Sequence, residues 1–152
     1  MIRFSMFMGV SLLVSFAACS TAPKSPSPLD QVNWSGVHDS RVEISYVLGH
    51  DRRQLIAHTD KRNVLIREVL DREVLDEGKV DQTKYSAFLK KAYEFALSPR
   101  RSLSGDSTCR TPFTVTVDID KENRTVSGCR DADETALSRL IKDGEFLLYS
   151  KK

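Results

Sequence analysis

Hydrophobic and polar side chains alternate along several short stretches of this chain. In RVEISYVLG the apolar residues fall at every second position: Val42, Ile44, Tyr46 and Leu48. A period of two places such residues on one face of a β-strand, and a glycine such as Gly49 is typical of a strand end. The segment RQLIAHT predicts the next strand, joined to the first through GHDR. This part of the chain is therefore expected to form a hairpin.

The same alternation recurs in PFTVTVDIDKENRTVSGC. Its apolar residues again take every second position: Phe113, Val115, Val117 and Ile119. The residues between them are threonine and aspartate, so the opposite face of the strand is polar. We expect a second hairpin here, with its turn at residues 121–123.

The segment NVLIREVLDREVLDEGKV, within residues 62–80, is compatible with two structures. Its apolar residues could share one face of a helix: Leu65, Ile66, Val69, Leu70 and Val74. The density of valine, isoleucine and leucine, together with Gly78, also suits two strands that turn near Asp71-Arg72. We favour the hairpin because the neighbouring segments predict a meander, and the helix remains the alternative.

Two segments show helical spacing instead. In DQTKYSAFLKKAYEFALSP, apolar residues recur at steps of three and four, Asp81 can cap the first turn, and Pro99 ends the pattern. A second, short helix is expected to begin at Asp131 or Asp133. Its inward side chains would be Leu137, Leu140 and Ile141, and Gly144 would form a left-handed C-cap. The remaining EFLLYSK predicts a last strand.

These elements predict an α+β fold, with an antiparallel sheet of five to seven strands and two helices packed on one face. The chain has 152 residues, of which 40% are hydrophobic and 29% charged, which fits one globular domain over residues 34–152. Its net charge of +2 is spread among acidic and basic residues, so we expect no nucleic-acid partner. The basic pair Arg52-Arg53 is interpreted as solvated surface.

The amino-terminal segment has the pattern of a secretory signal. Arg3 precedes an apolar run over residues 4–18, which is shorter than the roughly 20 residues of a membrane span. The run ends in Phe16-Ala17-Ala18-Cys19. These residues resemble the lipobox of bacterial lipoproteins, Leu-Ala/Ser-Gly/Ala-Cys, from which Phe16 differs at the first position.

The resemblance implies export, removal of residues 1–18, diacylglycerol on the sulfur of Cys19 and acylation of the new amino terminus. Membrane lipid is then a partner through Cys19, and several acyl chains give durable anchoring. Ser20 after the cysteine favours the outer membrane, with the domain in the periplasm. Residues 19–33, rich in serine and proline, are expected to form an extended tether.

The chain has three cysteines. With Cys19 assigned to lipid, Cys109 and Cys129 remain, and in an oxidising periplasm we expect them to form a disulfide. Free or redox-active thiols are the alternative, although no Cys-x-x-Cys motif is present.

Candidate chemistry is sparse in the sequence. His38-Asp39 and His50-Asp51 are possible His/acid pairs, and His58 is the third histidine. DIDKEN offers the oxygen ligands of a loose calcium loop: Asp118, Asp120, Glu122 and Asn123. The histidines lack metal-ligand spacing, and no phosphate loop or serine-nucleophile motif occurs, so we assign no catalytic, metal or cofactor-binding residue.

The sequence therefore predicts a membrane-anchored envelope lipoprotein that acts as a non-enzymatic binding, inhibitory or assembly module, with a protein of the envelope as a possible partner. A small hydrolase that uses a His/acid pair is one alternative. A structural component of the envelope is the other.

Overall fold

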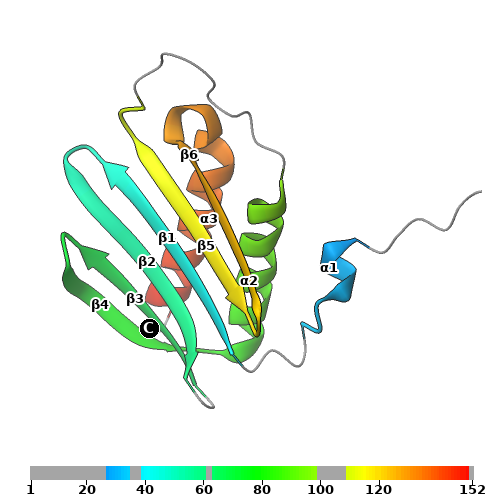
Figure 1. Ribbon diagram of the computed structural model, residues 1–152. Helices are drawn as coiled ribbons and strands as arrows, with labels where there is room; N and C mark the ends of the chain where they lie inside the picture. Colours follow the sequence, from blue (N-terminus) through cyan, green and yellow to red (C-terminus); the bar gives the residue numbers. More distant parts are fainter. Residues whose placement is uncertain (1–26, 35–38, 61–62, 99–108, 151–152) are drawn as a thin grey trace, which may run out of the picture.

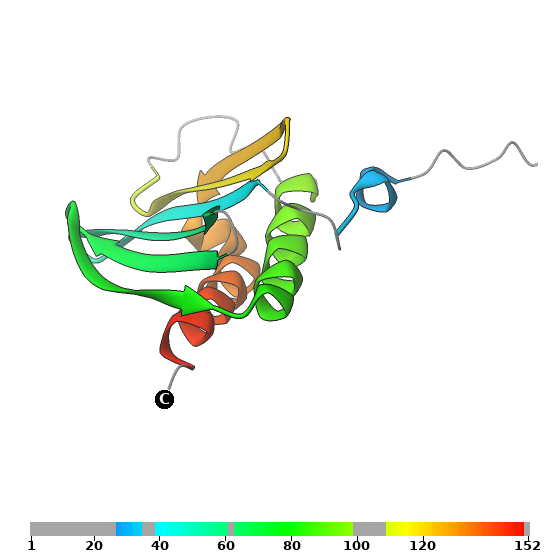
Figure 2. The ribbon, with the colours of Figure 1, turned by 90° about the horizontal axis from the view of Figure 1, so that it is seen from below.

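A computed structural model describes residues 27–34, 39–60, 63–98 and 109–150. Its centre is a six-stranded antiparallel sheet in the order β4-β3-β2-β1-β5-β6 (Figure 1). The two long helices, α2 (Gln82–Leu97) and α3 (Arg130–Tyr149), lie on the same side of this sheet, as Figure 2 shows. The predicted α+β architecture is therefore confirmed. Cys19 and the signal segment 1–18 lie outside the described residues.

The first four strands form a meander: β1 (Ser40–Leu48), β2 (Asp51–Asp60), β3 (Asn63–Leu70) and β4 (Glu73–Val80). Within the ambiguous segment 62–80, the described residues 63–80 form a hairpin, and it turns at Asp71 and Arg72 as favoured from the sequence. A β-bulge lies at Glu68/Val69 in the pairing of β3 with β4.

After α2 the chain returns to the other side of β1. Strand β5 (Pro112–Ile119) pairs with β1, and β6 (Glu122–Cys129) forms the far edge of the sheet. The turn between β5 and β6 comprises Asp120 and Lys121, so it begins one residue earlier than predicted. Alternation places the inward residues of β1 and β5 opposite each other, as in the pairs Val42–Val117 and Ile44–Val115.

Helix α2 begins as the sequence predicts. The side chain of Asp81 accepts hydrogen bonds from the backbone N–H groups of Thr83 (2.9 Å) and Lys84 (3.1 Å), which satisfies two of the unpaired donors of the first turn. The apolar face of the helix is buried against the sheet: Tyr85, Phe88, Leu89, Ala92, Tyr93 and Phe95.

Helix α3 differs from the prediction at both ends. It begins at Arg130, directly after β6, so neither Asp131 nor Asp133 starts it, and Cys129 occupies the N-cap position. It also continues through Gly144 to Tyr149, so the predicted C-cap and the last strand at EFLLYSK are wrong. The helical spacing explains the continuation, because the inward face of the helix extends past Gly144: Leu137, Leu140, Ile141, Leu147 and Leu148 are all buried.

Residues 27–34 also differ from the expected tether. Pro28–Gln31 form a short helix, α1, capped by reciprocal hydrogen bonds between Ser27 and Asp30. Leu29, Val32 and Trp34 pack against the core, and the Trp34 ring meets that of Tyr93 edge-to-face at 5.7 Å. The domain therefore includes part of the segment assigned to the tether, because its apolar residues find core surface to cover. Residues 19–26 lie outside the described part of the chain.

Within the described residues, no helix is both long enough and apolar enough to cross a membrane.

Candidate functional site

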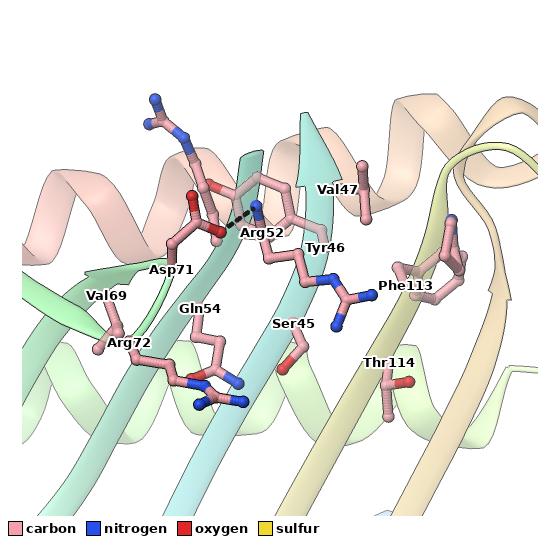
Figure 3. Close-up of a pocket in the computed structure, with 12 residues that line it drawn as sticks. Ser45, Tyr46, Val47, Arg52, Gln54, Val69, Asp71, Arg72, Phe113 and Thr114 are labelled. Carbon is pink, nitrogen blue, oxygen red and sulfur yellow. Dashed lines mark hydrogen bonds between the residues drawn. The ribbon is translucent and has the colours of Figure 1, made fainter. Parts of the chain in front are cut away.

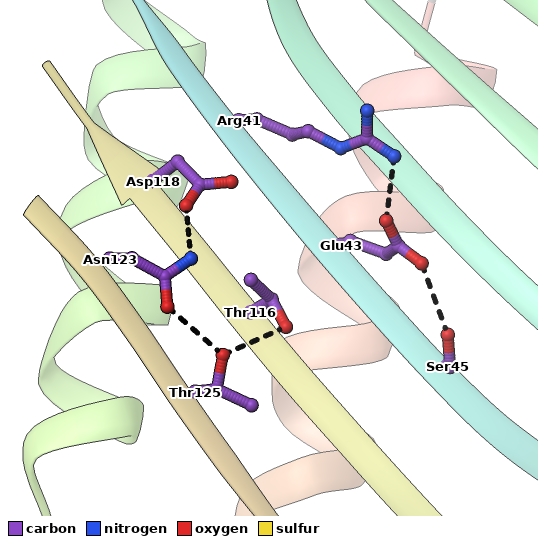
Figure 4. Close-up of polar contacts among 7 residues, drawn as sticks. All are labelled: Arg41, Glu43, Ser45, Thr116, Asp118, Asn123 and Thr125. Atoms are coloured by element: carbon purple, nitrogen blue, oxygen red, sulfur yellow. Dashed lines mark hydrogen bonds and ion pairs between the residues drawn. The ribbon is translucent and has the colours of Figure 1, made fainter. Parts of the chain in front are cut away.

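The helix-free face of the sheet carries mainly polar side chains over β1, β5 and β6. Because β1 and β5 bury one set of alternate residues beneath the helices, the other set projects from the opposite face. Hydroxyl groups pair across β5 and β6: Thr114 and Ser127 lie 3.1 Å apart. Thr116 and Thr125, which Figure 4 shows, lie 3.2 Å apart. This half of the sheet is a surface of hydrogen-bonding groups.

A hollow of about 600 Å³ lies at one end of the sheet (Figure 3). Four parts of the fold meet there: the end of β1, the start of β2, the turn between β3 and β4, and the start of β5. The residues that line it are Ser45, Tyr46, Val47, Arg52, Arg53, Gln54, Val69, Asp71, Arg72, Pro112, Phe113 and Thr114. A cavity of this size is within the range of small-ligand sites.

The turn between β3 and β4 shapes one wall of the hollow. Asp71 and Arg72 have φ angles of 46° and 80°, which is the left-handed region that favours glycine. Asp71 fastens the turn to β2, since its carboxylate accepts a hydrogen bond from the backbone N–H of Arg52 at 3.2 Å. Its own N–H donates to the carbonyl oxygen of Arg52 at 3.0 Å. The turn therefore fixes Arg72 beside β2.

Two arginines give the hollow its positive charge. The side chains of Arg52 and Arg72 are exposed, and neither has an ion-pair partner among the residues that the structure describes. Asp71 contributes the opposing carboxylate. The third arginine, Arg53, forms an ion pair with Glu68 at 3.1 Å, so its charge is already compensated.

A polar cluster lies behind the hollow, between the sheet and α3. Glu68 is 4% exposed and accepts hydrogen bonds from Arg53 (3.1 Å) and from the Tyr149 hydroxyl (2.7 Å). The hydrogen bond to Glu68, followed by burial, raises the pKa of Tyr149 to about 12. Burial, and then the charge of Glu68, raises the pKa of Glu145. Glu68 is thus satisfied by two donors, while Glu145 is destabilised in its ionised form.

The cysteines fix the rim of the hollow. The structure joins Cys109 to Cys129, with their Cα atoms 5.6 Å apart. Pro112, which lines the hollow, is paired in register with Cys129, and Arg130 N–H donates to the Thr111 carbonyl oxygen at 2.9 Å. The disulfide therefore ties the start of β5 to the end of β6 and the start of α3.

The two candidate histidines that the structure describes, His50 and His58, are not brought together. His50 is exposed in the turn between β1 and β2, whereas His58 lies near the other end of β2, roughly 25 Å away at the usual rise per residue. His38 lies outside the described residues. In the acidic loop, Asn123 donates a hydrogen bond to Asp118. Nowhere in the described ranges do three or more His, Cys, Asp or Glu side chains form a group that could hold a metal ion.

The residues of the hollow could not be recognised from the sequence pattern. Arg52 was interpreted as solvated surface, and Arg72 only as part of a turn. One signal was available, because Asp-Arg occupies a two-residue hairpin turn in which Asn-Gly or Asp-Gly is usual. Arg52 and Arg72 come close together only because β2 pairs with β3, and the register of this pairing cannot be read from the sequence.

Comparison of the chain with protein-family models, with curated proteins and with solved structures gave no match.

Proposed function

We propose that this chain is a lipid-anchored protein of the bacterial envelope that binds a ligand on the helix-free face of its sheet and does not transform it. The single observation that carries the proposal is the hollow between the turn at Asp71-Arg72 and the start of β5. Figure 3 shows Arg52, Gln54 and Thr114, which line it, on the side of the strands turned away from the two long helices.

The construction of the hollow supports a binding role. Its walls are strand ends and a hydrogen-bonded turn, so the backbone that carries its polar groups is held in place before any ligand arrives. The disulfide at Cys129 restrains the opposite wall. A preformed site loses little conformational entropy on binding, which favours affinity.

The anchor is proposed from the sequence. Cys19, with its resemblance to the lipobox cysteine, would hold the chain at the outer membrane, and residues 20–26 would connect it to α1. The hollow would then face the periplasm.

Site-specific photo-crosslinking in bacterial cells tests the binding face. A photoreactive amino acid is placed at Gln54 or Thr114, which line the hollow, and at Lys90 or Glu94, which are exposed on α2. We expect discrete adducts from the two sheet positions and none from the two helix positions. Equal crosslinking from both faces, or adducts only from α2, would contradict the proposal.

A further inference from the structure

We propose that the hollow binds a phosphate ester, with Arg52 and Arg72 as the residues that bind the phosphate group. This inference rests on the proposed function, since it names the ligand class of the same site. The ligand is defined by its chemistry: a phosphate with a small organic part, either a soluble metabolite or a phospholipid headgroup.

The charge of the site supports an anion. Arg52 comes from β2 and Arg72 from the turn, and both line the hollow without an ion-pair partner in the described ranges. Figure 3 shows the two guanidinium groups on the side of the strands turned away from the helices. Each guanidinium can donate two parallel hydrogen bonds to an oxyanion.

The conformation of Arg72 supports a functional role for its side chain. With φ at 80°, it occupies a position where glycine avoids the steric cost that other residues incur. Because the Arg72 side chain is exposed and makes no ion pair with the described residues, no such interaction offsets this steric cost. Strained residues of this kind cluster at ligand sites, where the side chain acts on the ligand.

The number of donors favours phosphate over carboxylate. Besides the two guanidinium groups, the hollow contains the Gln54 amide, whereas the Ser45 hydroxyl donates to Glu43 and the Thr114 hydroxyl is paired with Ser127. A phosphate group offers three strong acceptor oxygens, whereas a carboxylate offers two. The phosphate therefore uses more of the donors that the site provides.

The size and the apolar lining indicate that the phosphate carries an organic part. The hollow of about 600 Å³ is much larger than an inorganic phosphate ion. Apolar side chains line part of it: Val47, Val69 and Pro112. They would contact the carbon atoms of the ester.

The negative charge of Asp71 disfavours an anionic ligand, so removing this charge tests the role of electrostatics in the site. Its carboxylate accepts the hydrogen bond from the Arg52 N–H, a role that the side-chain oxygen of asparagine can also fill. Asparagine also tolerates a positive φ. Asp71→Asn therefore removes the negative charge and keeps the turn, so we expect phosphate esters to bind roughly threefold more tightly.

The experiment uses the full chain, purified in neutral detergent at constant ionic strength. It is titrated with inorganic phosphate, glycerol 3-phosphate and dihexanoylphosphatidylglycerol, with acetate and glycerol as controls for a carboxylate and for the organic part. Binding is followed by calorimetry and by the NMR signals of the arginine Nε–H groups. We expect saturable binding of the phosphate esters at millimolar concentrations or below, weaker binding of phosphate alone, and none of glycerol.

Three variants with the same change of charge test the residues. Arg52→Gln and Arg72→Gln should each weaken binding of the esters about tenfold. Arg41→Gln should not, because Arg41 lies on the same sheet face outside the hollow and is paired with Glu43. Equal effects of all three variants, acetate binding as tight as phosphate, or no binding of any ester would overturn the inference.

The titrations also separate the two sources of phosphate. Tighter binding of dihexanoylphosphatidylglycerol than of glycerol 3-phosphate identifies a lipid headgroup, and the reverse order identifies a soluble ester. Both outcomes support the phosphate site. Discrete crosslinks from the sheet face without phosphate binding would overturn this inference and leave the proposed function intact.

Discussion

Arg72 occupies a backbone conformation that suits glycine better than arginine. At a φ of 80°, a residue with a Cβ atom is disfavoured by about 1–2 kcal/mol relative to its usual conformations. Glycine avoids this cost but loses about 0.5–1 kcal/mol through the greater freedom of the unfolded chain. We expect Arg72→Gly to raise the free energy of unfolding by about 0.5–1 kcal/mol while it weakens phosphate-ester binding about tenfold, as measured by urea denaturation and titration.

Asp120 offers the matched control for Arg72→Gly. Its φ is 51°, it lies in the turn between β5 and β6, and it does not line the hollow. Asp120→Gly should leave ligand binding unchanged. A loss of stability in Arg72→Gly would show that the arginine stabilises the turn. This result would contradict the inference that its side chain serves ligand binding.

Glu145 makes stability depend on pH. Its pKa in the folded protein is raised above 4.5, so the folded state retains the proton to a higher pH than the unfolded state does. The native state therefore loses stability as the pH rises from below 4.5 through the folded pKa. We expect Glu145→Gln to have a higher free energy of unfolding than the parent at neutral pH, and this difference to shrink at acid pH. Urea denaturation at neutral and at acid pH measures both values.

Glu94→Gln is the control for this effect, because Glu94 is exposed on α2 and loses the same charge. It should change stability little at either pH. A stabilisation by Glu145→Gln that persists unchanged in acid would exclude the ionised carboxylate as its cause.

At the scale of elements, Gly144 allows α3 to pack closely against β2 and α2. A Cβ atom built at this position would lie 2.0 Å from Leu55 Cδ2 and 3.2 Å from Phe88 Cζ, so the helix here approaches both β2 and α2 closely. Gly144 is therefore required in the middle of α3 for packing against β2 and α2. The sequence had instead predicted that this glycine ends the helix as a C-cap.

Gly144→Ala should therefore destabilise the fold. Overpacking against the buried Leu55 costs about 1–3 kcal/mol, and the higher helix propensity of alanine offsets about 1 kcal/mol of this. Thermal and urea denaturation would measure the net loss. Adding Leu55→Val should recover part of the stability lost in Gly144→Ala, although Leu55→Val alone is destabilising. A simple sum of the two losses would contradict the predicted clash.

At the scale of the whole molecule, the sequence predicted what depends on local periodicity. Alternation identified β1 and the hairpin of β5 and β6, the hairpin of β3 and β4 was favoured over a helix from its neighbours, and Asp81 marked the start of α2. The end of α3 was missed because LeuLeuTyr after a glycine suits a strand as well as a helix, and only contact with β2 and α2 decides between them. The hollow was missed because Arg52 and Arg72 are distant in the sequence and come together only when β2 pairs with β3.

The anchor concerns the molecule as a whole, since it decides in which compartment the hollow meets its ligand. If Cys19 is the lipid attachment point, Cys19→Ala should eliminate incorporation of radiolabelled palmitate and release the chain from the membrane fraction. The matched control is the double variant Cys109→Ala/Cys129→Ala, which removes the disulfide and should keep the label. Persistent labelling of Cys19→Ala would place the lipid elsewhere, and labelling that depends on Cys109 or Cys129 would reassign the three cysteines.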